Sequence, residues 1–144
     1  MSESDTVKLL KECDAGTKTA VNSMKEVLEK VKRAELLTLL TDSIEAHEKL
    51  GTKANEMLSE DGESGKEPAL MARAMSWMKT NFKLLENDSD ATIAGLITDG
   101  CGMGIKQLSE YLNQYPTADS RAVAIAKDVI KEEERLAKAL REYL

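Results

Sequence analysis

Ionisable residues stand at points where an amphipathic helix should be apolar. Asp14, His47 and Glu132 each fall near the middle of a helix-forming segment, on the stripe of residues that faces a core. Burying such groups is costly unless they pair with one another or bind a cation. In di-iron bundles, carboxylates and histidines project from facing helices and hold metal ions. The pattern therefore predicts a carboxylate-rich site for Fe, Mn, Mg or Ca, with candidate ligands Asp14, Glu45, His47, Glu48, Asp99 and Glu132.

The spacing around His47 departs from the usual di-iron pattern. Di-iron helices carry E-x-x-H, which places both ligands on one face, whereas this chain has E-x-H at Glu45 and His47. His47 is also the only histidine, so one subunit cannot supply two histidine ligands. The alternative is a buried network in which His47 pairs with Asp14 or Glu132 without a metal.

Three glycines alternate with larger residues in DGCGMG, at Gly100, Gly102 and Gly104. A dinucleotide-binding loop has G-x-G-x-x-G between a strand and a helix, and this segment has neither that spacing nor a preceding strand pattern. Inside a helix, each glycine costs up to about 1 kcal/mol relative to alanine. Gly100 and Gly104 lie one turn apart and share a face. We expect that face to pack closely on a neighbour or to leave space beside a functional site, where a small ligand is a further alternative.

Composition sets the broad class. The 144 residues suit one domain with a core of its own, and 3% aromatic residues with many strong helix formers indicate an all-α protein. The net charge of −6 argues against nucleic-acid binding. No apolar run approaches the roughly 20 residues of a membrane span, and the N-terminus lacks a signal-peptide pattern. Cys13 and Cys101 form no zinc or CxxC motif, so we expect reduced thiols and a cytoplasmic protein.

The spacing of apolar residues predicts five helices in one domain. Pro68 opens the third, Ser89 or Asp90 caps the fourth, and Pro116 separates the last two. Short connections make the first two helices antiparallel neighbours, and a long connection containing the third leads to the second pair. This order is the single-crossover topology of ferritin-like bundles. The predicted helices span about residues 6–32, 34–59, 68–87, 91–114 and 118–143.

Segments along nearly the whole chain resemble one bacterial family. KECDAGTKTA, LLTLLTDSIEAHEKL, ARAMSWMKTNFKLL and DGCGMGIKQLSEYL follow in that order, before a charged final helix. In these features the chain is similar to the DUF2383 group, a ferritin-like four-helix-bundle family of uncharacterised proteins. The resemblance implies a ferritin-like bundle and a possible metal-binding or stress role. The chain lacks E-x-x-H on both expected helices, which argues against oxidase or iron-storage activity.

The sequence leaves more than one class of function open. The first is a non-catalytic structural or interaction module that forms homo-oligomers. Its methionine-rich third helix either covers one side of the bundle or forms a subunit interface. The second is a metal-binding or oxidase protein with Fe or Mn at the carboxylate-rich site. A carrier of small ligands, with a pocket beside the glycines, is the third.

Overall fold

The computed structural model describes residues 3–65 and 89–144. Regular structure in these two segments is entirely helical, which confirms the predicted all-α class. The predicted third helix, residues 68–87, lies outside the described residues. The α-helices are α1 (Asp5–Val27), α2 (Ala34–Glu60), α4 (Asp90–Gln114) and α5 (Ser120–Leu140), with short 3₁₀ turns at Leu28–Lys30 and Arg141–Tyr143.

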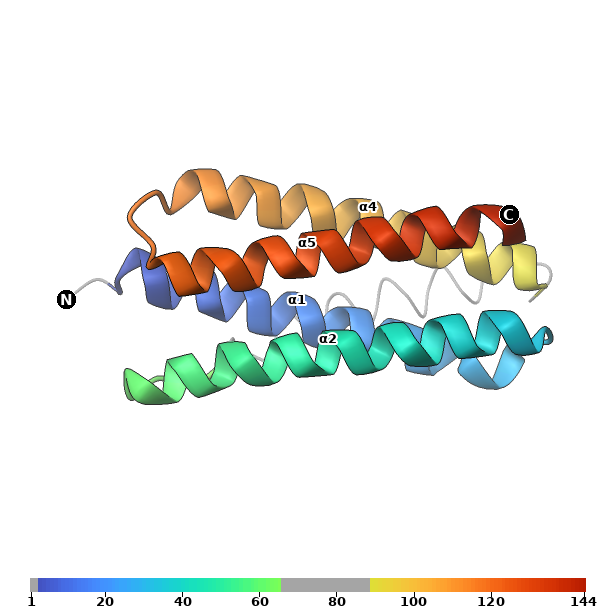
Figure 1. The fold of residues 1–144 in the computed structure, drawn as a ribbon, viewed down its shortest axis with the longest axis horizontal. Coiled ribbons are helices and arrows are strands. Elements are labelled where there is room, and N and C mark those ends of the chain that lie inside the picture. Colours follow the sequence, from blue (N-terminus) through green and yellow to red (C-terminus); the bar gives the residue numbers. More distant parts are fainter. Residues whose placement is uncertain (1–2, 66–88) are drawn as a thin grey trace.

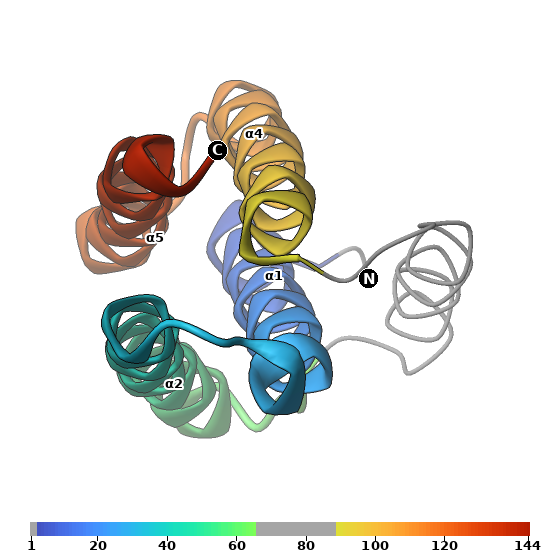
Figure 2. The same cartoon turned by 90° about the vertical axis from the view of Figure 1, so that its right-hand side faces the viewer.

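The four described helices form a bundle (Figure 1). α1 and α2 are antiparallel, as are α4 and α5, whereas α2 and α4 run in the same direction. The end view in Figure 2 shows α1 between α2 and α4, with α5 closing the bundle on the opposite side. The end of α2 at Glu60 and the start of α4 at Asp90 therefore lie at opposite ends of the bundle.

The first helix is shorter than the predicted 6–32. α1 ends at Val27, a 3₁₀ turn follows, and Val31 adopts an extended backbone. The physical cause is a tertiary contact, because the backbone N–H groups of Lys32 and Arg33 donate to the carboxylate of Asp90, each at 2.9 Å. These N–H groups thus bond to α4 and do not extend the helix.

At each end of the bundle, a carboxylate in the first turn of one helix binds the loop that connects two other helices. At one end, Asp90 holds the α1–α2 connection as described. At the other, the Asp5 carboxylate accepts from the backbone N–H and the hydroxyl of Thr117, at 3.0 and 2.6 Å. Thr6 accepts from the backbone N–H of Asp119 at 2.8 Å. Each loop between antiparallel helices is therefore fixed to the start of a different helix.

Removal of the Asp90 carboxylate should destabilise the fold. We expect Asp90→Ala to lower the free energy of unfolding by about 2 kcal/mol, because two charge-assisted hydrogen bonds are lost. Asp90→Asn keeps one acceptor oxygen and should lose about half as much. Urea unfolding of both variants measures the difference. A loss below about 0.5 kcal/mol in Asp90→Ala would show that these two hydrogen bonds do not contribute to the stability of the fold.

The interior consists of two apolar clusters with a polar layer between them. The cluster near the α1–α2 loop includes Met24, Leu40 and Leu136, and the other includes Leu10 and Leu108. His47, Ser43 and Glu133 are buried at the level between the clusters. The core thus contains a polar layer at mid-bundle, where the sequence predicted one.

Among the described residues, no helix combines the length and the apolar character that crossing a membrane would require.

Candidate functional site

The centre of the polar layer is a contact between α2 and α5. His47 is completely buried and Glu133 is 4% exposed. Nε2 of His47 lies 3.5 Å from Oε1 of Glu133, an electrostatic contact too long for a well-formed hydrogen bond. Nδ1 lies 2.8 Å from the carbonyl oxygen of Ser43, one turn earlier. Because a carbonyl oxygen only accepts, we assign a proton to Nδ1, which leaves Nε2 to face the carboxylate.

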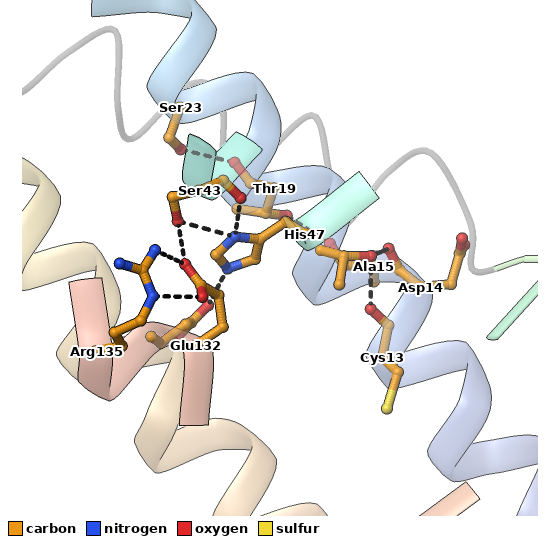
Figure 3. A network of polar contacts seen from close by, with 11 residues as sticks. Cys13, Asp14, Ala15, Thr19, Ser23, Ser43, His47, Glu132 and Arg135 are labelled. Carbon is orange, nitrogen blue, oxygen red and sulfur yellow. Dashed lines mark hydrogen bonds and ion pairs between the residues drawn. The ribbon is translucent and has the colours of Figure 1, made fainter. Parts of the chain in front are cut away.

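A second carboxylate is held close to this pair but is already neutralised. Glu132 accepts from the Ser43 hydroxyl at 2.7 Å, and Arg135 donates to both of its oxygens, at 2.8 and 2.6 Å (Figure 3). Burial acts to raise the pKa of Glu132, but these donors hold it below the usual value. Glu132 is therefore an ionised carboxylate whose charge is taken up by Arg135.

The buried pair retains a proton more strongly than its separate groups would in water. Burial acts to lower the pKa of His47, but the Glu133 carboxylate and the Ser43 carbonyl together raise it above 6.5. Burial raises the pKa of Glu133, against the opposing influence of His47. One proton can therefore reside on either partner while the other remains able to accept or donate.

A cavity of about 420 Å³ lies between α1 and α4 and reaches the pair. Its wall on α1 consists mostly of small side chains, with Glu12 and Met24 in addition, and the wall on α4 contains Gly100 and Gly104. Leu96, Ile97 and Leu136 add apolar surface. The small residues that line it are Ala15, Gly16, Thr19, Ala20, Ser23, Gly100, Cys101 and Gly104.

The three glycines of the DGCGMG segment in α4 have three different surroundings. They lie inside one uninterrupted helix, as predicted. A Cβ at Gly104 would collide with the carboxylate of Glu133, whereas a Cβ at Gly100 would meet nothing within 4 Å. Gly102 is exposed and also has open space. The lack of a side chain at Gly104 thus makes room for the Glu133 carboxylate, and the lack of one at Gly100 leaves space within the cavity.

Two buried polar atoms of the cavity wall lack a hydrogen-bond partner within the described residues. They are Nε2 of His47 and Oε2 of Glu133. Hydroxyls on the α1 wall are satisfied by their own helix, since Thr19 donates to the Ala15 carbonyl and Ser23 to that of Thr19, each at 2.8 Å. Unpaired buried groups cost free energy, so the pair is the part of the wall where a bound polar group would contribute most.

The predicted metal ligands do not converge on one point. Asp14 is buried, but it accepts from Lys18 at 2.8 Å and from Asn55 on α2, and Figure 3 shows it apart from His47. The side chains of Glu45 and Glu48 are more than half exposed and lie near Lys49 and Lys25, and Asp99 is exposed. Of the six predicted ligands, only His47 and Glu132 lie close together, and both form hydrogen bonds with Ser43.

The site does not fit a metal centre of the di-iron type. Nδ1 of His47 is engaged by a backbone carbonyl, and Arg135 occupies both oxygens of Glu132. The described residues contain no group of three or more His, Cys, Asp or Glu side chains placed to hold a metal ion. The arrangement instead matches the predicted alternative of a buried polar network, although the partner of His47 is neither Asp14 nor Glu132.

That partner, Glu133, is the residue that the sequence reasoning missed. Three consecutive glutamates lie between Val129 and Leu136, and both Glu132 and Glu133 fit the helical stripe that joins these two apolar residues. A signal was nevertheless present in Gly104, because a glycine inside a helix indicates a neighbour that needs room.

The stability contributed by the pair should fall as pH rises. Because the folded pKa of His47 lies above 6.5, its contribution is fully present below that pH and is lost as pH rises through the folded value. In Glu133→Gln the carboxylate that raises the pKa of His47 is gone, while the Ser43 carbonyl and Glu132 still raise it against burial, so the loss of stability with rising pH should become smaller. Urea unfolding at a series of pH values between about pH 6 and about pH 9 measures both slopes. Equal slopes in the two proteins would contradict the pairing.

A scan against protein-family models, a search of curated proteins and a search of solved structures each found no match to this chain. The similarity to the DUF2383 group therefore stays a prediction, and the site's own geometry has to support any assignment of function.

Proposed function

We propose that this protein binds a small organic molecule in the cavity between α1 and α4, with a polar group of that molecule on the His47–Glu133 pair. One observation carries the proposal: Nε2 of His47 and Oε2 of Glu133 are buried on the wall of a cavity of about 420 Å³ and have no hydrogen-bond partner in the part of the chain that the structure describes. Ligand sites in proteins commonly measure about 300–1,000 Å³ and combine apolar walls with a few convergent polar groups.

The energetics of α4 support the same proposal. Glycine inside a helix is less stable than alanine by about 1 kcal/mol, and a Cβ at Gly100 or Gly102 would meet no described residue within 4 Å. Empty apolar space also forgoes dispersion contacts. A ligand in the cavity would restore contacts along α4 and would give Glu133 a hydrogen-bond partner.

We propose binding without covalent chemistry. Cys101 is the thiol that lines the cavity among the described residues, and burial raises its pKa to about 12. A thiol stays protonated far below its pKa, and the protonated form is a poor nucleophile. The pair therefore serves to orient a ligand and to exchange a proton with it.

We also propose that the bundle belongs to the ferritin-like type. α2 and α4 run in the same direction, so the end of α2 and the start of α4 lie at opposite ends of the bundle, which supports the single crossover of ferritin-like topology. Binding of Fe or Mn, assembly into homo-oligomers and a role as an interaction module stay predictions from the sequence.

Titration with indole, a small and mostly apolar probe, tests the proposal. In ¹H–¹⁵N spectra we expect saturable shifts for one site, largest at the amides of Ala20, Gly100 and Gly104. Gly51 and Ala122 do not line the cavity and serve as internal controls. Shifts that stay linear with indole concentration and spread over the surface would contradict a binding cavity.

A further inference from the structure

The charge of the cavity wall indicates which class of molecule it takes. The ionisable side chains of acidic or basic type on the wall are Glu12, His47 and Glu133. Among the described residues, neither lysine nor arginine lines the cavity. Nearby cations are bound elsewhere, since Lys18 pairs with Asp14 at 2.8 Å and Arg135 with Glu132 at 2.6 Å. The described part of the wall therefore carries two carboxylates and one group, His47, that can become positive.

The unpaired oxygen of Glu133 needs a donor. Oε1 faces the ring of His47, while Oε2 has no hydrogen-bond partner within the described residues. An ionised carboxylate only accepts hydrogen bonds, so a complementary ligand must supply an N–H or O–H group. A cationic donor adds Coulomb attraction to the carboxylate beyond the hydrogen bond itself, which favours a cation over a neutral donor.

The rest of the wall accommodates an apolar body. Met24, Leu96, Ile97 and Leu136 line the cavity together with the small residues of α1 and α4. The Tyr111 hydroxyl is already engaged, because it bonds to Glu12. The strongest free polar contact thus remains at Glu133.

From this arrangement we infer that the ligand is a small organic cation, an ammonium with an apolar alkyl or aryl body, whose N–H groups donate to Oε2 of Glu133. This inference rests on the proposed function and names its ligand class. The ammonium supplies a donor for Oε2 and a positive charge complementary to the carboxylates of the described wall, while the apolar body fills the space beside Gly100.

Binding of a cation should displace a proton from His47. An ammonium beside Glu133 disfavours an imidazolium at 3.5 Å from the same carboxylate, so His47 binds the ligand in its neutral form. Affinity for the ammonium should therefore rise with pH, until the amine itself loses its proton. The other charged or titratable groups around the pair are Glu132 and Arg135 on α5, Glu12 on α1, and Cys101 and Tyr111 on α4.

Isothermal calorimetry with three isosteric probes tests the inference. Phenethylammonium, phenethyl alcohol and phenylacetate share one body and differ in the charge of the head. We expect phenethylammonium to bind at least about tenfold more tightly than the alcohol, with phenylacetate the weakest. Glu133→Gln should remove this preference, whereas Glu134→Gln, an exposed neighbour that does not line the cavity, should keep it.

The outcomes separate the two proposals. Equal or tighter binding of the alcohol or of phenylacetate would overturn the ammonium, and saturable binding of indole would then leave the proposed function intact. Failure of indole and of all three probes to bind would overturn both. If Glu133→Gln does not fold, the wild-type protein is titrated in two buffers that differ in their heat of ionisation. The binding enthalpy of phenethylammonium should then depend on the buffer, because binding releases a proton, whereas that of the alcohol should not.

Discussion

Replacing Gly100 with leucine will stabilise the protein and weaken its binding of indole by at least about tenfold. A Cβ at this position meets nothing within 4 Å, and the residue lines the cavity, so the new side chain enters empty space. Loss of a helical glycine contributes about 1 kcal/mol, and burial of the leucine side chain adds about 1–2 kcal/mol. Urea unfolding and an indole titration by NMR measure the two effects on the same protein.

Gly102→Leu is the matched control for this prediction. Gly102 belongs to the same helix and also has open space around it, but it is exposed and does not line the cavity. The variant should gain about 1 kcal/mol from helix propensity and bind indole like the wild type. Equal losses of binding in both variants, or unchanged binding in Gly100→Leu, would show that the cavity is not where indole binds.

Replacing Gly104 with alanine will have the opposite effect on stability. The new Cβ would collide with the Glu133 carboxylate, which must then move within a buried layer and leave His47. We expect a net loss of about 2 kcal/mol, because disturbing a buried pair outweighs the gain in helix propensity. No other glycine of α4 meets a side chain in this way.

A double-mutant cycle isolates the cause. In a Glu133→Ala background the collision is gone, so Gly104→Ala should stabilise that variant by up to about 1 kcal/mol. In a Glu133→Gln background the side chain keeps its size, so the same change should still destabilise. Additive effects of Gly104→Ala and Glu133→Ala would contradict the contact between the two residues.

The parts of this structure that local patterns dictate could be predicted from the sequence. Helical periodicity gave the four described helices, and the shared face of Gly100 and Gly104 pointed to space beside a functional site. His47 could be recognised as buried because it interrupts an apolar stripe. The residue at which α1 ends could not be predicted, because Asp90, far along the chain, binds the N–H groups of Lys32 and Arg33.

The partners within the polar layer could not be predicted for a related reason. Periodicity places a residue on a face of a helix but does not fix its depth along the bundle relative to the other helices. Asp14 and His47 are both fully buried, yet Asp14 bonds to Asn55, two turns further along α2. Glu132 and Glu133 are adjacent in the sequence, and Glu133 is recognised as the buried one only from its packing against Gly104.

The most direct test of the cavity as a binding site is a set of intermolecular nuclear Overhauser effects between bound indole and the protein at saturation. The structure predicts contacts from indole protons to the methyl groups of Ala20, Ile97 and Leu136, which line the cavity from three different helices. Contacts confined to exposed side chains such as Leu37, with none to these three residues, would contradict a ligand site between α1 and α4.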